Sequence, residues 1–232
     1  MNSYPFVLSE SDTLDRVLAG VSLARYGDGE FKIAGTSSDI KSQPYHIELA
    51  KRLRNILIDS GACMVGIPNI HSATPKAEFW GRQMQFCSLL DDTRRYASSF
   101  ITRPDSAPWI DEPSYWDRLE SLWVGHDVTL IGGSPKSLKP EDLVGAGTIT
   151  EIQAPRQNAW AEYGDLVKRI GRPKRAIICL GPTATVLAVD LCRRGVHAVD
   201  LGHIGMFLRK HRRGEPMWLT KEDKSHDKAV SA

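Results

Sequence analysis

Short apolar runs alternate along the chain with longer segments in which apolar residues recur every three or four positions. The short runs lie between glycine, proline and acidic residues, and a strand that is buried on both faces has this continuous apolar pattern. We expect strands at Val21–Tyr26, Ala62–Ile67, Tyr96–Thr102, Asp127–Ile131, Thr148–Gln153, Arg175–Leu180 and His197–Leu201.

The segments with helical spacing lie between most of these strands. In His46–Asp59, for example, Ile47, Ala50, Leu53 and Leu57 fall on one side of a helix. We expect further helices at Pro75–Leu90, Pro113–Trp123, Ala159–Ile170 and Thr183–Arg193. Strands that alternate with helices predict an α/β fold with a mostly parallel sheet and helices on both faces.

Length and composition narrow the class of protein. The 232 residues suit one α/β domain, which we place at residues 1–213, followed by a polar C-terminal tail at 214–232. A net charge of +2 argues against a protein that coats nucleic acid, so we expect no nucleic-acid partner. We also expect no transmembrane segment and no signal peptide, and the four scattered cysteines fit a reduced, cytoplasmic protein.

Glycine and polar residues follow nearly every predicted strand. Ligands of open α/β sheets bind beyond the carboxyl ends of the strands, where glycine lets the backbone approach them closely. The segments in question are Gly27–Glu30, Gly66–Pro68, Thr102–Pro104, Gly132–Ser134, Ala154–Asn158, Gly181–Thr183 and Gly202–His203. This convergence predicts a site for a polar ligand at that edge of the sheet.

The segment after the first strand has the most specific chemistry. Asp28 and Glu30 are separated by one residue in a glycine-flanked turn, with Gly27 and Gly29 beside them and Arg25 just before. Two such carboxylates can face one point and hold Mn²⁺ or Mg²⁺, which prefer oxygen ligands and often share phosphate oxygens. Arg25 adds a planar fork for phosphate. The alternative is a surface turn in which these residues serve backbone geometry alone.

Two further segments could bind the same ligand. In Gly181-Pro182-Thr183 a strand runs into a helix, where Thr183 can cap the helix and the free N–H groups can receive a phosphate. The alternative there is an ordinary capped turn. Asn158 is likewise either a cap or an amide that faces the ligand.

Charged residues near the C-terminus also have two interpretations. His203 follows a strand end, where it either ligates a metal or moves a proton, or else has a structural role. The basic cluster Arg209–Arg213 is either a solvated helix face or a surface that contacts anionic lipid or a phosphorylated acceptor. The latter use would place the protein at the cytoplasmic face of a membrane.

Several motifs together resemble the GT-D class of glycosyltransferases, a family first catalogued as a domain of unknown function. RYGDGEF, Gln43, HIELAKRLRNIL and VGIP resemble its opening, and LGPTATVLAVDLCRRGVHAVDLGHI resembles its closing signature. APRQNAW lies between them and matches another element of the family. The resemblance covers roughly residues 20 to 205, and both end motifs occur in the expected order.

The resemblance implies a Rossmann-like fold of GT-D type and a metal-dependent transfer of a hexose. The donor would be a UDP-sugar, UDP-glucose or UDP-galactose, and the acceptor a lipid-linked or protein-linked glycan. The family's Asp-x-Glu motif falls on Asp28 and Glu30, and its Gly-His pair places His203 at the same centre. We therefore expect all three residues to bind the metal and take part in catalysis. Arg25, Gly27, Gly29, Asn158, Gly181, Pro182 and Thr183 would bind the donor.

The chain departs from the family pattern at three places. Gly132 stands where the family has glutamate, Lys136 and Ser137 replace an arginine, and Gly205 stands where an acidic residue often follows Gly-His-Ile. These differences spare the donor motifs and concern the acceptor side. They also keep a rival interpretation open, a non-catalytic module that binds sugar nucleotides or acts as a scaffold.

A nicotinamide-dependent oxidoreductase is a second rival on the same kind of sheet. It is disfavoured because GDGEFK lacks the third glycine of the dinucleotide-binding fingerprint. The mechanism that we expect is attack of an acceptor hydroxyl on the anomeric carbon of the donor, with Asp200 and His203 as candidate bases.

Overall fold

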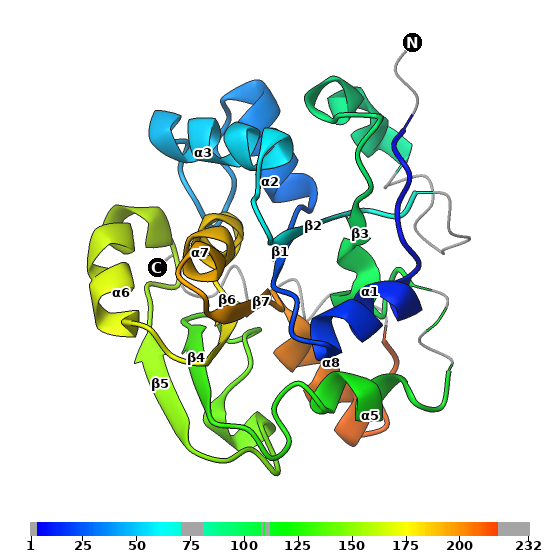
Figure 1. Ribbon diagram of the computed structural model, residues 1–232, viewed down its shortest axis with the longest axis vertical. Coiled ribbons are helices and arrows are strands. Elements are labelled where there is room, and N and C mark those ends of the chain that lie inside the picture. The colour runs from blue at the N-terminus through cyan, green and yellow to red at the C-terminus, as the bar shows by residue number, and fades with distance from the viewer. Residues whose placement is uncertain (1–3, 71–80, 108, 110–111, 218–232) are drawn as a thin grey trace.

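Seven parallel strands form one sheet at the centre of the molecule. The computed structural model describes residues 4–70, 81–107, 109 and 112–217 (Figure 1). Within this part of the chain the strand order is β3-β2-β1-β7-β6-β4-β5, and every neighbouring pair is parallel. The strands are β1 (Leu23–Arg25), β2 (Met64–Ile67), β3 (Ala97–Ser98), β4 (Val128–Gly132), β5 (Ile149–Gln153), β6 (Arg175–Cys179) and β7 (His197–Asp200). The predicted parallel sheet is confirmed, and each predicted strand is present.

The third strand is much shorter than its apolar run predicted. Only Ala97–Ser98 pairs with β2, and Ser99–Thr102 then forms the 3-10 helix η2. The Ser98 hydroxyl accepts a hydrogen bond from the Phe100 N–H at 3.1 Å, which caps this helix. Phe100 and Ile101 are nevertheless fully buried, so the apolar pattern reported burial and not strand conformation.

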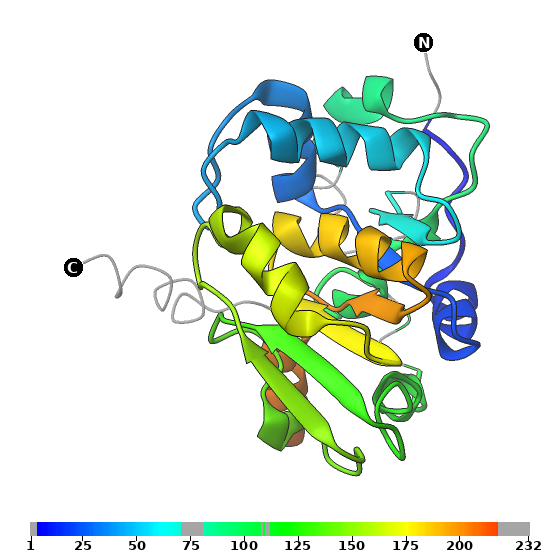
Figure 2. The same ribbon diagram turned by 60° about the vertical axis from the view of Figure 1, so that its left-hand side comes forward.

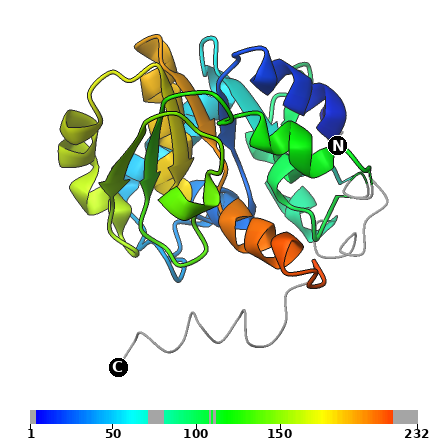
Figure 3. The same ribbon diagram turned by 90° about the horizontal axis from the view of Figure 1, so that it is seen from below.

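Helices cover both faces of the sheet, as the alternating pattern predicted. One face carries α2 (Asp28–Thr36), α3 (Ile47–Ile58), α6 (Tyr163–Ile170) and α7 (Pro182–Arg193) (Figures 1 and 2). The opposite face carries α1 (Glu10–Leu18), α5 (Tyr115–Glu120) and α8 (Ile204–Arg212), as the view from below shows (Figure 3). Shorter 3-10 segments are η1 (Arg82–Leu89), η4 (Pro140–Asp142) and η5 (Ala159–Glu162).

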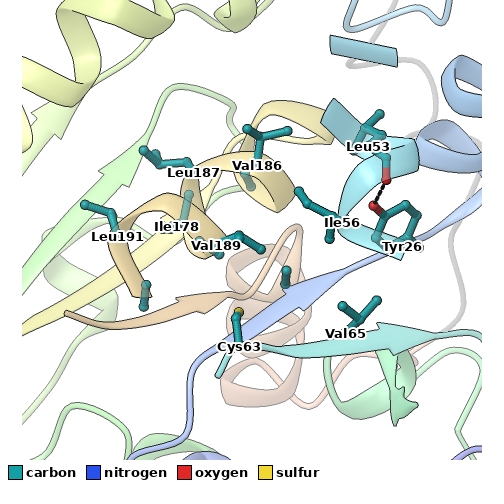
Figure 4. Packing of buried hydrophobic residues seen from close by; sticks show 14 of the residues in the cluster. Tyr26, Leu53, Ile56, Cys63, Val65, Ile178, Val186, Leu187, Val189 and Leu191 are labelled. Atoms are coloured by element: carbon teal, nitrogen blue, oxygen red, sulfur yellow. Dashed lines mark hydrogen bonds between the residues drawn. The ribbon is translucent and has the colours of Figure 1, made fainter. Parts of the chain in front are cut away.

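Successive side chains of each central strand point to opposite faces of the sheet and pack in two separate hydrophobic cores. In β6, Ala176 and Ile178 join the core beneath α3 and α7, whereas Ile177 and Cys179 join the core beneath α5 and α8. This period of two explains why the strand reads as apolar without a break. In the first core, α7 packs on the sheet and the Tyr26 hydroxyl donates to the Leu53 carbonyl of α3 at 2.6 Å (Figure 4).

The helix predictions are confirmed in part. Helices α3 and α7 match their predicted segments, α5 is shorter than predicted, and the segment from Ala159 begins as η5 before α6. Of the predicted helix Pro75–Leu90, residues 75–80 lie outside the described residues and Arg82–Leu89 is a 3-10 helix. Helices α1 and α2 were not predicted. No helix in the described ranges is long and apolar enough to cross a lipid bilayer.

The connections after β1 and β7 leave the sheet in opposite directions. These two strands are neighbours, but the chain passes from β1 into α2 on one face and from β7 into α8 on the other. Phe31 of α2 belongs to the first core and Phe207 of α8 to the second. Such a topological switch point opens a crevice at the carboxyl edge, and this is where an α/β sheet binds its ligand.

Candidate active site

A cavity of about 550 Å³ lies at this switch point, bounded by the segments that follow β1, β3, β4, β5, β6 and β7. The volume is within the range of roughly 300–1,000 Å³ that small-molecule sites occupy. Eight predicted site residues line it: Arg25, Gly27, Asp28, Gly29, Glu30, Gly181, Pro182 and His203. The structure therefore brings together six of the seven segments whose convergence the sequence predicted, and Gly66–Pro68, after β2, does not line the cavity.

Asp28 and Glu30 lie on the first turn of a helix and not in a free turn, which corrects the prediction for this segment. Helix α2 begins at Asp28, with Gly27 as its N-cap residue. The Glu30 carboxylate turns back and accepts a hydrogen bond from the Gly27 N–H at 2.7 Å, which satisfies a backbone donor that the helix itself leaves unpaired. For Glu30 the interpretation as a local backbone contact is thus correct in part, while exposed Asp28 extends into the cavity wall.

The Glu30 carboxyl lies among other acidic groups. Burial raises the pKa of Glu30 to about 7, the bond from the Gly27 N–H opposes this, and the charges of Asp200 and Asp28 raise the pKa further. The carboxyl groups of Asp28, Glu30 and Asp200 line one cavity and offer oxygen atoms for a hard divalent cation. They do not form a complete cage, because no group of three or more His, Cys, Asp or Glu side chains in the described ranges is arranged to hold a metal.

Arg25 is held in place by β7 and η2. Its Nε donates to the Asp200 carbonyl at 2.7 Å, its Nη2 donates to Asp200 Oδ1 at 3.2 Å, and its Nη1 donates to the Ser99 carbonyl at 3.3 Å. A Cβ on Gly202 would lie 2.1 Å from Arg25 Nη2, so only glycine leaves room for this guanidinium. Arg25 is therefore a rigid positive charge in the cavity wall.

Asp200 is the partner that fixes Arg25. Burial raises the pKa of the Asp200 carboxyl, and the charge and hydrogen bond of Arg25 lower it. Its Oδ1 also accepts from the Gly202 N–H at 3.0 Å. His203 follows as the N-cap residue of α8, and its exposed side chain lines the cavity. Of the two candidate bases, His203 is exposed at the cavity, whereas the carboxylate of Asp200 is buried and bonded to Arg25 and Gly202.

Two of the predicted donor-binding residues, Thr183 and Asn158, contact Gln43 in the structure. Helix α7 begins at Pro182 with Gly181 (φ +60°) as its N-cap, so Thr183 is not the cap, and its buried hydroxyl contacts Gln43 Oε1 at 3.5 Å. Asn158 precedes η5, but its side chain makes no capping bond and instead accepts from Gln43 Nε2 at 2.8 Å. Neither residue lines the cavity.

Gln43 is the centre of the network that these two residues belong to. It is buried at 2% exposure, and besides the two contacts above its Nε2 donates to the Pro44 carbonyl at 3.1 Å and its Oε1 accepts from the Trp160 N–H at 3.2 Å. The network ties the start of α7 to the loops on either side of the cavity. Apart from Pro44, these partners lie more than a hundred residues away in the sequence, so no local pattern indicated this role.

Several charged residues of the cavity wall were not predicted. They are Lys32, Asp39, Lys41, Arg103 and Arg156. Arg103 follows η2 and forms a two-bond ion pair with Asp105, from Nε to Oδ1 at 2.8 Å and from Nη2 to Oδ2 at 2.9 Å. The position of Arg103 after the third strand was the one available signal, and it was noted without a role.

Comparison with known proteins settles the family. A model of the family described as the glycosyltransferase GT-D fold matches residues 23–224. The chain belongs to the GT-D glycosyltransferase family. Two solved structures are similar over 91% of this chain. One, reported as domain of unknown function 1792 with a distinct glycosyltransferase fold, has a TM-score of 0.82, 28% identity and 83% of its chain covered. The other, described as a new glycosyltransferase from Streptococcus sanguinis, has a TM-score of 0.78, 27% identity and 86% of its chain covered.

Two curated relatives are larger proteins. A probable glycosyl transferase Gly of Streptococcus gordonii is 32% identical over 219 residues, which make up 85% of this chain and 32% of the relative. Glycosyltransferase GlyD of Streptococcus pneumoniae serotype 4 is 29% identical over 212 residues, 83% of this chain and 26% of the relative. The chain thus spans about a third or less of the length of each relative.

The three positions at which the sequence predicted departures from the GT-D pattern meet at one loop in the structure. A Cβ on Gly205 would lie 2.4 Å from the Ser137 carbonyl oxygen, and a Cβ on Gly132 would lie 3.1 Å from the Ser137 Cβ. The Met206 N–H donates to the Lys136 carbonyl at 3.1 Å, so α8 packs directly on this loop. A larger residue at 205 would clash with this backbone, and one at 132 would push against the Ser137 side chain, so these positions share one local packing environment.

Proposed function

We propose that this GT-D protein transfers a hexose from a nucleotide sugar, UDP-glucose or UDP-galactose, to a hydroxyl group of a lipid-linked or protein-linked glycan. The observation that carries the proposal is the switch-point cavity, where Asp28, Glu30 and the fixed Arg25 face one space beside the start of α7. Carboxylates for a cation and donors for an anion are both needed to hold a metal-bound diphosphate.

We further propose that Mn²⁺ or Mg²⁺ binds through Asp28, with Glu30 and His203 as additional ligands. The carboxylate oxygens fit such a cation, which often takes its remaining ligands from phosphate and water. A bound cation supplies a Lewis acid that neutralises negative charge on the leaving diphosphate. The position of Glu30 supports this role, because its carboxyl group lines the same cavity as that of Asp28, and a cation between them would offset the negative charge of both.

The remaining residues position the reactants. Arg25, oriented by Asp200, places positive charge where the leaving group becomes more negative. The start of α7 borders the same cavity at Gly181 and Pro182, although Pro182 offers no N–H and the Ala184 N–H donates to the Gly181 carbonyl at 2.8 Å. His203 is our proposed acceptor of the proton that leaves the attacking hydroxyl, since it is exposed on the cavity wall.

One observation favours a second candidate, a module that binds sugar nucleotides without turnover. The hydrogen bond from Gly27 occupies one oxygen of Glu30, and the protein ligands alone do not complete a metal site in the described ranges. Release of free sugar from UDP-glucose or UDP-galactose by the purified protein, or transfer to an acceptor, separates the enzyme from the module.

The test is a thermal-shift screen of nucleotides and nucleotide sugars with and without Mn²⁺. A bound ligand at a hundredfold excess over its Kd stabilises the fold by about 2.7 kcal/mol. We expect a shift with UDP and Mn²⁺ that Asp28→Asn abolishes, and no shift with NADH. Asp165→Asn is the matched control, because Asp165 lies in the first turn of α6, outside the cavity. A nucleotide shift that ignores Mn²⁺ and persists in Asp28→Asn would contradict the metal role.

A further inference from the structure

Arg103 is a charged side chain of the cavity wall that has no role in the mechanism above and whose orientation is fixed by an ion pair. It follows η2 and is 24% exposed, while the side chain of its partner Asp105 is 0% exposed. Two parallel hydrogen bonds join them, so the plane of the guanidinium is fixed and not merely its charge. The buried Asp105 carboxylate therefore holds the Arg103 guanidinium in one orientation at the cavity wall, as directional binding of a ligand would require.

The surroundings of Arg103 favour an anionic ligand with several oxygens. Burial lowers the pKa of Arg103 to about 10, the charge of Asp28 raises it, and the charge of Arg25 lowers it. Arg103 therefore stays protonated at neutral pH, close enough to Arg25 for the two charges to repel each other. Both line the same cavity as Asp28. Two neighbouring guanidinium groups next to a carboxylate that can hold a cation suit a diphosphate.

We propose that Arg103 binds phosphate oxygens of the donor's diphosphate and that Asp105 is its positioning residue. The proposal rests on the proposed function. During transfer the bond from the anomeric carbon to the diphosphate oxygen breaks, and its electron pair stays on that oxygen. The acceptor oxygen bonds to the anomeric carbon and loses its proton to the base. Arg103 stabilises the negative charge that the leaving diphosphate gains.

The test compares the affinities of UDP, UMP, uridine and inorganic pyrophosphate at a fixed Mn²⁺ concentration, by calorimetry on the full chain. We expect Arg103→Gln to weaken binding of UDP and pyrophosphate about ten- to hundredfold, as loss of charge-assisted hydrogen bonds does. The affinity for UMP should fall less, and the affinity for uridine should not change. Arg103→Lys should be intermediate, because it keeps the charge and loses the fork. Arg118→Gln is the control, since Arg118 is similarly exposed at 23% and pairs with Asp15 outside the cavity.

Asp105→Asn tests the positioning role. It should weaken UDP binding in the wild-type background and have no further effect in the Arg103→Gln background, because the two residues act as one unit. Additive losses, with the melting temperature falling in step, would mean that Asp105 serves only the fold and would overturn its assignment.

The outcomes separate this inference from the proposed function. UDP binding that is unchanged in Arg103→Gln, or an equal loss for UDP and uridine, overturns the inference and leaves the glycosyltransferase proposal standing. If UDP binds normally but the KM for a phosphorylated acceptor rises, Arg103 recognises the acceptor and the donor assignment is wrong. Failure of the wild type to bind any nucleoside diphosphate overturns both.

Discussion

At the scale of single residues, Glu30 combines two roles that a sequence pattern cannot separate. Its carboxylate accepts from the N-terminal backbone of α2, and it also lines the cavity beside Asp28 and Asp200. The first role stabilises the helix and the second repels neighbouring charge. A raised pKa means that the folded state disfavours the ionised carboxylate. Either a bound proton or a nearby cation reduces this cost.

The pH dependence of stability should reveal this cost. The pKa of Glu30 rises from 4.5 to about 7 on folding, so between these values the folded state binds more protons than the unfolded state. The stability that this group contributes is fully present below pH 4.5 and is lost as pH rises through 7, by roughly 3 kcal/mol at about 1.4 kcal/mol per pKa unit. We expect urea titrations of wild type and Glu30→Gln to converge at low pH and the variant to be the more stable at pH 8. Glutamine keeps an acceptor for the Gly27 N–H. A wild-type–variant difference that does not change between pH 4.5 and 8 would contradict the raised pKa.

At the scale of elements, basic side chains of helix α8 form ion pairs with neighbouring segments. Arg209 pairs with Asp142, and Arg212 contacts Glu120 at 3.3 Å, so these side chains hold α8 against its neighbours. The cluster Arg209–Arg213 thus has a structural use, and the structure adds no support for its use as a lipid-binding surface. The N-terminus of α8 presses on the loop that holds Ser137.

A pair of glycine substitutions tests that close packing. Gly205→Ala should destabilise the protein by about 1–3 kcal/mol, because the new Cβ meets the Ser137 carbonyl oxygen at 2.4 Å. Gly164 is the matched control: it too is the second residue of its helix, α6, and a Cβ there meets nothing within 4 Å. Gly164→Ala should leave stability unchanged or raise it by up to about 1 kcal/mol. Denaturant unfolding checks both, and equal effects at the two positions would show that α8 does not need this contact.

At the scale of the whole molecule, one edge of the sheet collects the chemistry. Adjacent strands β1 and β7 send their connections to opposite faces, and the cavity between them receives side chains from six strand ends. A ligand there touches segments that are far apart in sequence. Ligand binding should therefore slow amide exchange in several of these segments at once.

Hydrogen exchange can detect that distribution. With UDP and Mn²⁺ at a hundredfold excess, we expect amides in residues 27–30, 156–157, 179–181 and 202–203 to exchange more slowly, by up to about a hundredfold where opening excludes the ligand. Residues 127–129 lie at the opposite end of β4 and serve as the internal control. Protection confined to a single segment, or equal protection in the control, would mean that the ligand does not bind in the switch-point cavity.

The sequence alone determined the sheet, its parallel strands and most of the cavity wall. Burial imposes continuous apolar runs on strands and a regular spacing on helices, and both are local signals. The same rule placed Arg25, Asp28, Gly181 and His203 at one edge, since carboxyl ends of parallel strands meet there.

The tertiary structure alone decided which way side chains turn and which distant residues meet. Glu30 bonding to Gly27, Thr183 turning to Gln43 and Arg103 locked to Asp105 depend on capping, burial and packing, which spacing does not encode. The order of strands likewise follows from the packing of both cores. Contacts between residues far apart in the chain leave no periodic pattern in the sequence. The residues that orient the site's side chains are therefore identified only in the folded structure.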